Sequence, residues 1–172
     1  HNEPVPDTGP YAQYKVMQLA SKKVKVTLDG QGADEELAGY HYFFGIYYKE
    51  LFFKLKFVRL FIESFQYIIK HKSINNLIYF LFYLFPLFIK KRVNKMIYPS
   101  ISRTFLKNNV HNDSLSVMLY SPKNLNESLL QHFEYKLEHL LKWEDLNSMS
   151  FSIESRVPFL DHRLVEATLS SP

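Results

Sequence analysis

A short alternating segment that runs into two glycines and an acidic turn is the feature that most restricts the fold of this chain. Residues 24–28 are Val-Lys-Val-Thr-Leu, and residues 29–36 are Asp-Gly-Gln-Gly-Ala-Asp-Glu-Glu. The alternation predicts a strand, and the acidic run predicts the start of a helix. Nucleotide-handling α/β folds expose backbone amides to a ligand where a strand passes through glycines into a helix. The pattern therefore favours phosphate and metal chemistry at this loop.

The residue types in the loop suggest how it would hold a ligand. Gly30 and Gly32 permit positive φ and close approach of a ligand, and the amides of residues 33–36 are expected to be unpaired donors. The carboxylates of residues 34–36 would repel a polyphosphate, whereas Mg²⁺ between them would remove the conflict. The alternative, that Asp34 is only an N-cap and the glutamates only dipole partners, stays open. The spacing matches neither the Walker A pattern nor the full dinucleotide fingerprint.

A second motif near the other end of the sequence makes a family resemblance specific. Residues 148–161 are Ser-Met-Ser-Phe-Ser-Ile-Glu-Ser-Arg-Val-Pro-Phe-Leu-Asp. In this order, the two motifs resemble the synthetase domain of the glutamine-hydrolysing asparagine synthetase family. Residues 2–4 and 11–14 also resemble the segment before the family's loop, whereas the middle of the chain matches poorly. The resemblance implies an interior segment of the C-terminal synthetase, or ATP pyrophosphatase, domain.

The resemblance carries expectations about fold and activity. It implies an α/β parent fold of the adenine nucleotide alpha hydrolase-like type, of which this segment supplies mostly α-helix and about one parallel strand. We expect one partial domain over 1–172 with a helical insertion at about 36–142. The family uses ATP and Mg²⁺ to adenylate the side chain of aspartate, and glutamine-derived ammonia then displaces AMP to give asparagine. The implied partners are aspartate, ammonia, the remainder of the synthetase and its glutaminase domain.

The resemblance also assigns roles to individual loop residues. Gly30 and Gly32 match glycines that let substrate lie against the backbone, and Asp34 matches an acidic ligand of Mg²⁺-pyrophosphate. Gln31 and Glu35 are the candidate catalytic residues. Several relatives have Glu or Asp in place of Gln31, and an amide is no general base, although it can hydrogen-bond substrate. Glu35 is expected to organise the loop rather than to react.

Departures from the family pattern keep other functions open. Asp29 stands where serine is common and Leu146 where many relatives carry arginine, which leaves the acyl substrate open. The sequence has no Ser-Gly-Gly-x-Asp-Ser loop and no cysteine for a glutaminase nucleophile. We therefore expect the chain alone to bind ATP weakly and to make no amide. The alternatives are a related adenylating enzyme acting on another carboxylate and a non-catalytic helical interaction module.

Charge and composition argue against two classes of partner. A formal net charge of +4 is too small to favour nucleic acid without a localised basic patch. The apolar run at 77–85 is shorter than the roughly 20 residues that a bilayer core requires, and Pro86 interrupts it. The absence of cysteine fits a reducing compartment, so we expect a cytoplasmic protein without membrane contact.

Apolar spacing predicts helices at 10–21, at 35–48 and over a longer segment whose apolar residues share one face. That face comprises Leu51, Leu55, Val58, Ile62, Phe65 and Ile69. We expect it to pack against a buried helix at 74–89 that is kinked at Pro86, with Lys90 and the cations after it suited to a helix C-terminus.

Smaller signals complete the expectations. Asn124 and Glu127 predict a capping box, and Asp161 predicts an N-cap for the helix at 162–166. Ser148 and Met149 are expected to open a short helix, and His132 and His139 to be ordinary helix residues. Glu154 and Arg156 are expected to form a buried ion pair that fixes the loop, with substrate-side positioning as the alternative. Finally, we expect the diglycine loop and the Arg-Val-Pro-Phe-Leu-Asp run to converge and line a cavity.

Overall fold

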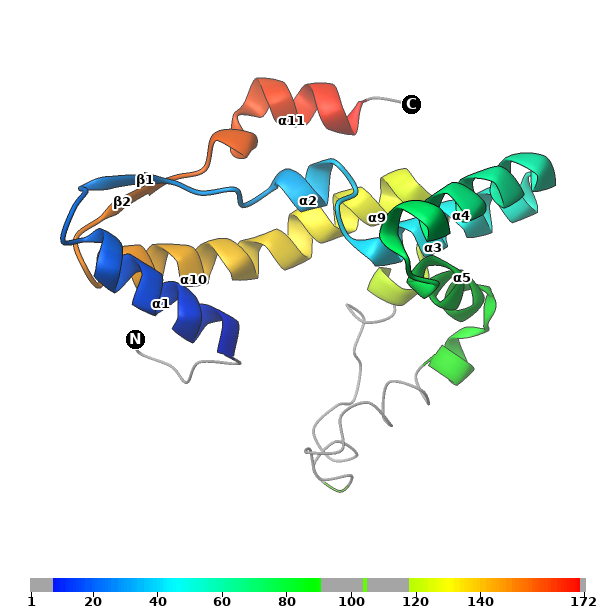
Figure 1. The fold of residues 1–172 in the computed structure, drawn as a ribbon, viewed down its shortest axis with the longest axis horizontal. Helices are drawn as coiled ribbons and strands as arrows, with labels where there is room; N and C mark the ends of the chain where they lie inside the picture. The colour runs from blue at the N-terminus through cyan, green and yellow to red at the C-terminus, as the bar shows by residue number, and fades with distance from the viewer. Residues whose placement is uncertain (1–7, 91–103, 105–117, 171–172) are drawn as a thin grey trace. The chain divides into compact units, whose positions relative to one another are not determined.

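The computed structural model describes residues 8–90, 104 and 118–170 (Figure 1). The chain divides into two units. One unit comprises His1–Leu37 with His132–Pro172, and the other comprises Ala38–Gln131. The described residues are mostly helical with one small parallel sheet. This content is compatible with a fragment of an α/β fold, as the sequence predicts.

The first unit contains both sequence motifs. Its elements are α1 (Thr8–Ala20), β1 (Val26–Leu28), α2 (Ala33–Glu36), the π-helix η1 (His132–Lys136), α10 (Leu137–Met149), β2 (Glu154–Arg156), the 3₁₀-helix η2 (Pro158–Leu160) and α11 (His162–Leu169). Helices α1 and α10 lie side by side, and β2 packs against α10 (Figure 1). Met17, Trp143 and Ile153 are buried between these elements.

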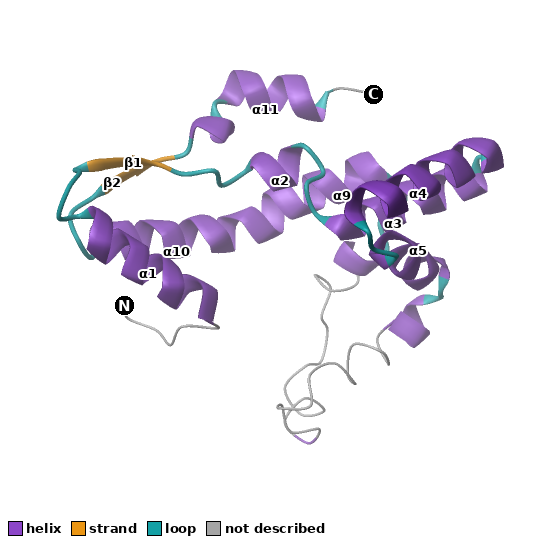
Figure 2. Ribbon diagram, in the orientation of Figure 1, coloured by secondary structure: helices purple, strands orange, loops and turns teal. Residues whose placement is uncertain are grey.

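The two strands form a parallel pair (Figure 2). Val26 lies opposite Glu154, and Leu28 lies opposite Arg156. Parallel pairing requires a long crossover, and here the whole second unit lies between the strands in sequence. Strands of three residues have little stability alone, so this sheet depends on the helix packed against it.

A tight turn at the end of α10 sends the chain back into β2. Ser152 has a φ of 53°, Ile153 N donates to Ser148 O at 3.1 Å, and Ser152 N donates to Met149 O at 3.1 Å. This pair of bonds is the Schellman arrangement that ends a helix with a left-handed residue. The prediction that Ser148 and Met149 open a helix is therefore wrong, because they close a long one.

The second unit is a set of helices held mainly by aromatic side chains. Its elements are α3 (His41–Phe53), α4 (Phe57–His71), α5 (Asn75–Leu84) and α9 (Leu125–Gln131). Helix α3 packs closely on α5 because Gly45 has no side chain: a Cβ there would lie 2.6 Å from the carbonyl carbon of Tyr79. Phe43, Ile46 and Tyr48 are buried in the same contact.

Two predicted helices are interrupted by left-handed residues. The helix expected at 35–48 breaks between α2 and α3, where Ala38 has a φ of 55°. The long helix expected from Leu51 onward breaks between α3, which ends at Phe53, and α4, which begins at Phe57. In this break Leu55 has a φ of 56°, and Lys56 N donates to Leu51 O at 2.9 Å. Apolar spacing continues across both breaks because it records side chains and not backbone hydrogen bonds.

Most of the apolar face predicted to be buried is exposed. Leu51 on α3 is 4% exposed, but Val58 is 76% exposed and Phe65 is 56% exposed. The expectation that this face packs against 74–89 is therefore wrong for the residues beyond Leu51. The predicted interruption at Pro86 is present, but it is a break and not a kink, since α5 ends at Leu84 and Phe85 is extended before Pro86. The same segment buries Tyr83 but leaves Ile78 and Leu81 exposed, so it is only partly the buried helix that was predicted.

Charged and polar ends of helices follow the sequence closely. Lys90 Nζ donates to the carbonyls of Tyr83 and Tyr120, as suits a cation at a helix C-terminus; residues 91, 92 and 95 lie outside the described ranges. Asn124 Oδ1 accepts from Glu127 N at 2.8 Å. The Glu127 carboxylate accepts from Lys123 N instead of Asn124 N, so the capping box is shifted by one residue.

None of the helices in the described ranges combines the length and the apolar content that crossing a membrane requires.

The strained turn at Leu55 gives a direct test of the α3–α4 boundary. Leu55 is 73% exposed and has a left-handed backbone conformation. The substitution L55G therefore removes backbone strain and costs little buried area. We expect L55G to raise the free energy of unfolding by about 0.5–1 kcal/mol, measured by urea denaturation.

The matched control is V58G, which is equally exposed but lies inside α4. We expect V58G to lower the free energy of unfolding by about 1 kcal/mol. Equal effects of the two glycines would contradict the assigned break.

Candidate functional site

The two sequence motifs leave the same edge of the sheet. Asp29 N donates to Arg156 O at 2.8 Å, which continues the pairing one residue beyond β1. The diglycine loop and the run from Val157 to Asp161 therefore begin next to each other, as the carboxyl ends of parallel strands do. The predicted convergence of the motifs is confirmed here, and the lining of a cavity by them stays a prediction.

Gly32 is required by the local geometry, whereas Gly30 is not. Gly32 has a φ of 97°, and a Cβ on it would lie 2.3 Å from Leu160 Cδ2. A Cβ on Gly30, the first glycine of the loop, would have no heavy atom within 4 Å. The φ of Gly30 is not in the left-handed range. The positive φ expected at Gly30 is therefore wrong, but the open space beside it suits the close approach of a ligand.

The loop satisfies several of its own backbone donors. Gln31 N donates to Asp29 Oδ1 at 3.1 Å, and Ala33 N donates to Gly30 O at 3.3 Å. Glu36 N donates to the carbonyl of the second loop glycine at 3.0 Å. The expectation of unpaired amides is thus wrong for Ala33 and Glu36.

Helix α2 is a single turn of four residues, so it offers little helix dipole to an anion. Its N-cap is Gly32, without a side-chain cap bond. The alternative interpretation of Asp34 as an N-cap is therefore wrong.

The carboxylates of α2 have different surroundings. Asp34 is exposed, whereas Glu35 is 1% exposed and lies on the side of α2 that packs against η1. Burial lowers the pKa of Lys136 on η1, and the charges of Glu35 and Asp34 oppose that effect. A half-buried cation thus faces the acidic turn from a segment distant in sequence.

Glu36 connects the loop to α11. Its Oε2 accepts a hydrogen bond from Thr168 Oγ1 at 3.3 Å. Its Oε1 is buried without a hydrogen-bond partner in the described part of the chain, beside Gly32. Burial raises the pKa of this carboxyl. An unsatisfied carboxylate oxygen at the loop is suited to a hard cation or a hydrogen-bond donor.

Glu144 lies beneath the sheet and is a residue that the sequence reasoning missed. It is 3% exposed, and its Oε1 accepts from Ser155 Oγ at 2.6 Å while its Oε2 accepts from Gln13 Nε2. Burial, together with a hydrogen bond to Asp29 and the charge of that residue, raises the pKa of Glu144 to about 7. The only sequence signal was its position just before the second motif.

The ion pair and cap of the second motif are both on the surface. Arg156 Nε lies 2.7 Å from Glu154 Oε1, with the two side chains 61% and 60% exposed. The prediction of a buried pair is wrong, because residues two apart on a strand share one face and here that face is uncovered. Asp161 accepts from Arg163 N at 3.0 Å, which confirms the predicted cap of α11.

No group of three or more His, Cys, Asp and Glu in the described ranges is placed to hold a metal. His132 is buried in η1, and His139 accepts from Trp143 Nε1 at 3.2 Å. A Mg²⁺ ion of the predicted kind needs only one or two carboxylates besides phosphate oxygens and water.

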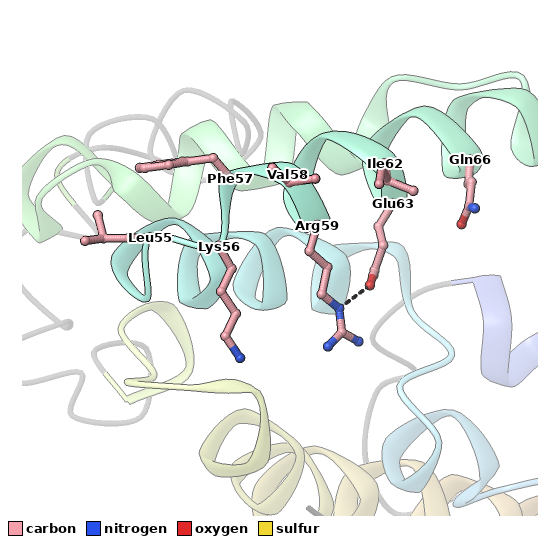
Figure 3. Close-up of a pocket in the computed structure, with 8 residues that line it drawn as sticks. All are labelled: Leu55, Lys56, Phe57, Val58, Arg59, Ile62, Glu63 and Gln66. Atoms are coloured by element: carbon pink, nitrogen blue, oxygen red, sulfur yellow. Dashed lines mark hydrogen bonds and ion pairs between the residues drawn. The ribbon is translucent and has the colours of Figure 1, made fainter.

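A pocket of about 590 Å³ lies in the second unit, on the turn before α4 and along that helix (Figure 3). It is lined by Leu55, Lys56, Phe57, Val58, Arg59, Ile62, Glu63 and Gln66. Arg59 and Glu63 neutralise each other there through a 2.7 Å ion pair. The pocket includes no residue of either motif.

Comparison with known families decides the relationship. A family model of asparagine synthase matches residues 1–172. The chain belongs to the asparagine synthase family. Searches of curated proteins and of solved structures return no significant match. Membership indicates an amide-forming synthetase of the ligase type that uses ATP, in agreement with the resemblance carried by the two motifs.

The contrast between the two loop glycines can be measured. We expect G32A to lower the free energy of unfolding by about 1–3 kcal/mol, because it combines a strained φ with a clash against Leu160. G30A is the control and should change that value by less than about 0.5 kcal/mol, because its methyl group enters open space. Urea unfolding of the purified variants measures both, and similar losses would contradict the loop geometry.

Proposed function

We propose that this member of the asparagine synthase family adenylates the side-chain carboxylate of aspartate with ATP and transfers the acyl group to ammonia. The products are asparagine, AMP and pyrophosphate. The observation that supports the proposal most is the hydrogen bond from Asp29 N to Arg156 O. It joins the first residue of the diglycine loop to the Arg-Val-Pro-Phe-Leu-Asp run of the second motif at one sheet edge, which is where α/β folds bind their ligands.

The diglycine loop would hold the nucleotide. The open space beside Gly30 lets a phosphate or ribose approach the backbone. Asp34 is exposed and would hold Mg²⁺ together with phosphate oxygens and water, and Glu36 offers an unsatisfied carboxylate oxygen on the same turn. These oxygen donors fit Mg²⁺, which when bound neutralises charge developing on the pyrophosphate.

The remaining loop residues would orient the substrate and the loop. Gln31 is partly exposed, and its side-chain amide can donate to one substrate atom and accept from another, without acting as a base. Glu35 is buried opposite Lys136, which suits a residue that fixes α2 more than one that touches substrate. We therefore propose Gln31 as the residue that contacts substrate.

The exposed ion pair supports a substrate-side role for the second motif. Glu154 and Arg156 lie on the solvent face of β2 at the edge where the loop begins. Arg156 presents a guanidinium that pairs well with carboxylate or phosphate groups. We propose that it helps to orient the acyl substrate.

Two other functions remain as alternatives. A related enzyme could act on a different carboxylate, since Asp29 and Leu146 depart from the family pattern. A helical interaction module is favoured by one observation, the exposed apolar face of α4. The cytoplasmic location, and the supply of ammonia by a glutaminase domain, are parts of the main proposal.

The proposal is tested by pyrophosphate exchange into ATP, measured on the protein expressed from its complete reading frame. We expect exchange that depends on aspartate, and D34N should reduce it by about 10²–10³-fold because a charge-stabilising ligand is lost. D145N is the matched control, since Asp145 is an exposed aspartate on α10, and it should retain exchange. Exchange that ignores aspartate and follows another carboxylic acid would refute the substrate.

The 172-residue chain by itself gives a second comparison. We propose that it binds ATP weakly and makes no amide, because its sequence lacks the family's Ser-Gly-Gly-x-Asp-Ser loop. Release of AMP and pyrophosphate by the purified chain would contradict this.

A further inference from the structure

One side of helix α4 presents a row of apolar side chains to solvent. Residues three and four apart share a face of an α-helix, and the exposed apolar residues of α4 follow that spacing. They are Val58, Phe61, Ile62, Phe65 and Ile69, and together they form the exposed face of α4. Phe61 is 72% exposed, and its ring lies parallel to that of Phe65 with the centroids 6.5 Å apart. A contiguous apolar surface of this kind marks an interaction site.

The opposite side of α4 holds the helix to its own unit. Tyr67 is 4% exposed, and its ring packs against that of Phe44 on α3 with the centroids 4.8 Å apart. Glu63 accepts a hydrogen bond from Tyr47 Oη on α3 at 2.9 Å, and Ser64 is buried. These contacts fix the rotation of α4 about its own axis. The exposed face of α4 is therefore directed to solvent by the packing of the unit itself.

The charge around this face is positive. Glu63 is the only acidic residue in the sequence from 51 to 90, and Arg59 neutralises it through a 2.7 Å ion pair. Other cations stand at both ends of α4, namely Lys56, Lys70 and Lys72. The side chains of Lys56 and Arg59 extend to the same side of the helix (Figure 3). The surface thus suits a partner that is both apolar and negatively charged.

We propose that the exposed face of α4 binds the surface of a membrane that contains anionic lipids, with the helix lying along the interface. Its Phe and Ile side chains enter the boundary between headgroups and acyl chains. The lysines contact the lipid phosphates while their stems cover apolar surface. The inference goes beyond the proposed function, and its test needs neither ATP nor aspartate.

A helix that lies in the interface needs no segment long enough to cross the bilayer. The expectation of no membrane contact rested on the length that a bilayer core requires. It therefore does not apply to α4, whose apolar residues occupy one side of the helix only.

The charge and the shape of the face favour a lipid surface over a second copy of this chain. Two copies docked through α4 would bring the cations at its ends close together, and like charges repel. The face is also the convex side of a single helix. A bilayer accommodates a convex apolar surface without a matching groove, because lipids rearrange around it.

The first test measures binding to sedimented vesicles, in the protein expressed from its complete reading frame. The vesicles are phosphatidylcholine alone or with about 30 mol% phosphatidylserine. Wild type should bind the anionic vesicles. The variant F61Q/F65Q should lower this binding about 10–10²-fold, because two apolar side chains no longer enter the lipid while glutamine preserves helix propensity.

The matched control for the apolar residues is V16Q/L19Q. It removes two apolar side chains from α1 that are 62% and 68% exposed. Binding of this variant to the anionic vesicles should equal that of wild type, because α1 lacks the proposed contact.

The second test separates charge from apolar contact. K70Q/K72Q should lower binding to the anionic vesicles about 10-fold and leave binding to phosphatidylcholine nearly unchanged, because the two cations act only on lipid charge. K22Q/K23Q is the control, since it removes two exposed lysines that follow α1, and it should bind as wild type. Raising the salt concentration to about 0.5 M should reduce the difference between the two kinds of vesicle.

Several results would overturn the proposal. Wild type that stays in the supernatant with anionic vesicles would do so, as would F61Q/F65Q that binds like wild type. V58Q/I69Q repeats the apolar test if urea unfolding shows that F61Q/F65Q does not fold. Sedimentation equilibrium without lipid tests the other occupant. A wild-type dimer that becomes a monomer in F61Q/F65Q would assign the face to a second copy and overturn the lipid surface.

Discussion

The parallel pairing of β1 with β2 is the constraint on which the candidate site depends. Its register sets Leu28 opposite Arg156, so the next backbone hydrogen bond runs from Asp29 N to Arg156 O in the second motif. A slip of one residue would turn every strand side chain to the other face. Both motifs would then leave the sheet at different heights, and Gly32 would no longer meet Leu160. The chemistry of the loop thus follows from six strand residues.

Helix α10 makes so short a sheet possible. It supplies Trp143 and Glu144 to the buried interior, and its Schellman end at Ser152 directs the chain into β2. Glu144 accepts hydrogen bonds from Gln13 on α1 and Ser155 on β2. Because a buried carboxyl is costly unless it is hydrogen-bonded, these bonds favour one arrangement of α1, α10 and β2. Stability and site geometry are therefore provided by the same side chains.

The sequence was informative where a local rule applied and uninformative where burial decided. The strand, the second loop glycine, the interruption at Pro86 and the Asp161 cap follow from backbone preferences of nearby residues. The breaks at Ala38 and Leu55 do not, since neither residue type favours positive φ. The apolar face of α4 shows the same limit: its spacing predicts a helix correctly, but spacing does not say which surface covers it.

The sequence by itself determined the family and the order of a strand, a glycine loop and a second motif, because these are properties of neighbouring residues. Only the tertiary structure decided that Lys136 faces the acidic turn and that the buried Glu144 accepts hydrogen bonds from Ser155 and Gln13. It also decided that Glu154 and Arg156 stay on the surface. The physical reason is that charge, burial and hydrogen bonding depend on groups brought together by folding, and those groups lie far apart along the chain.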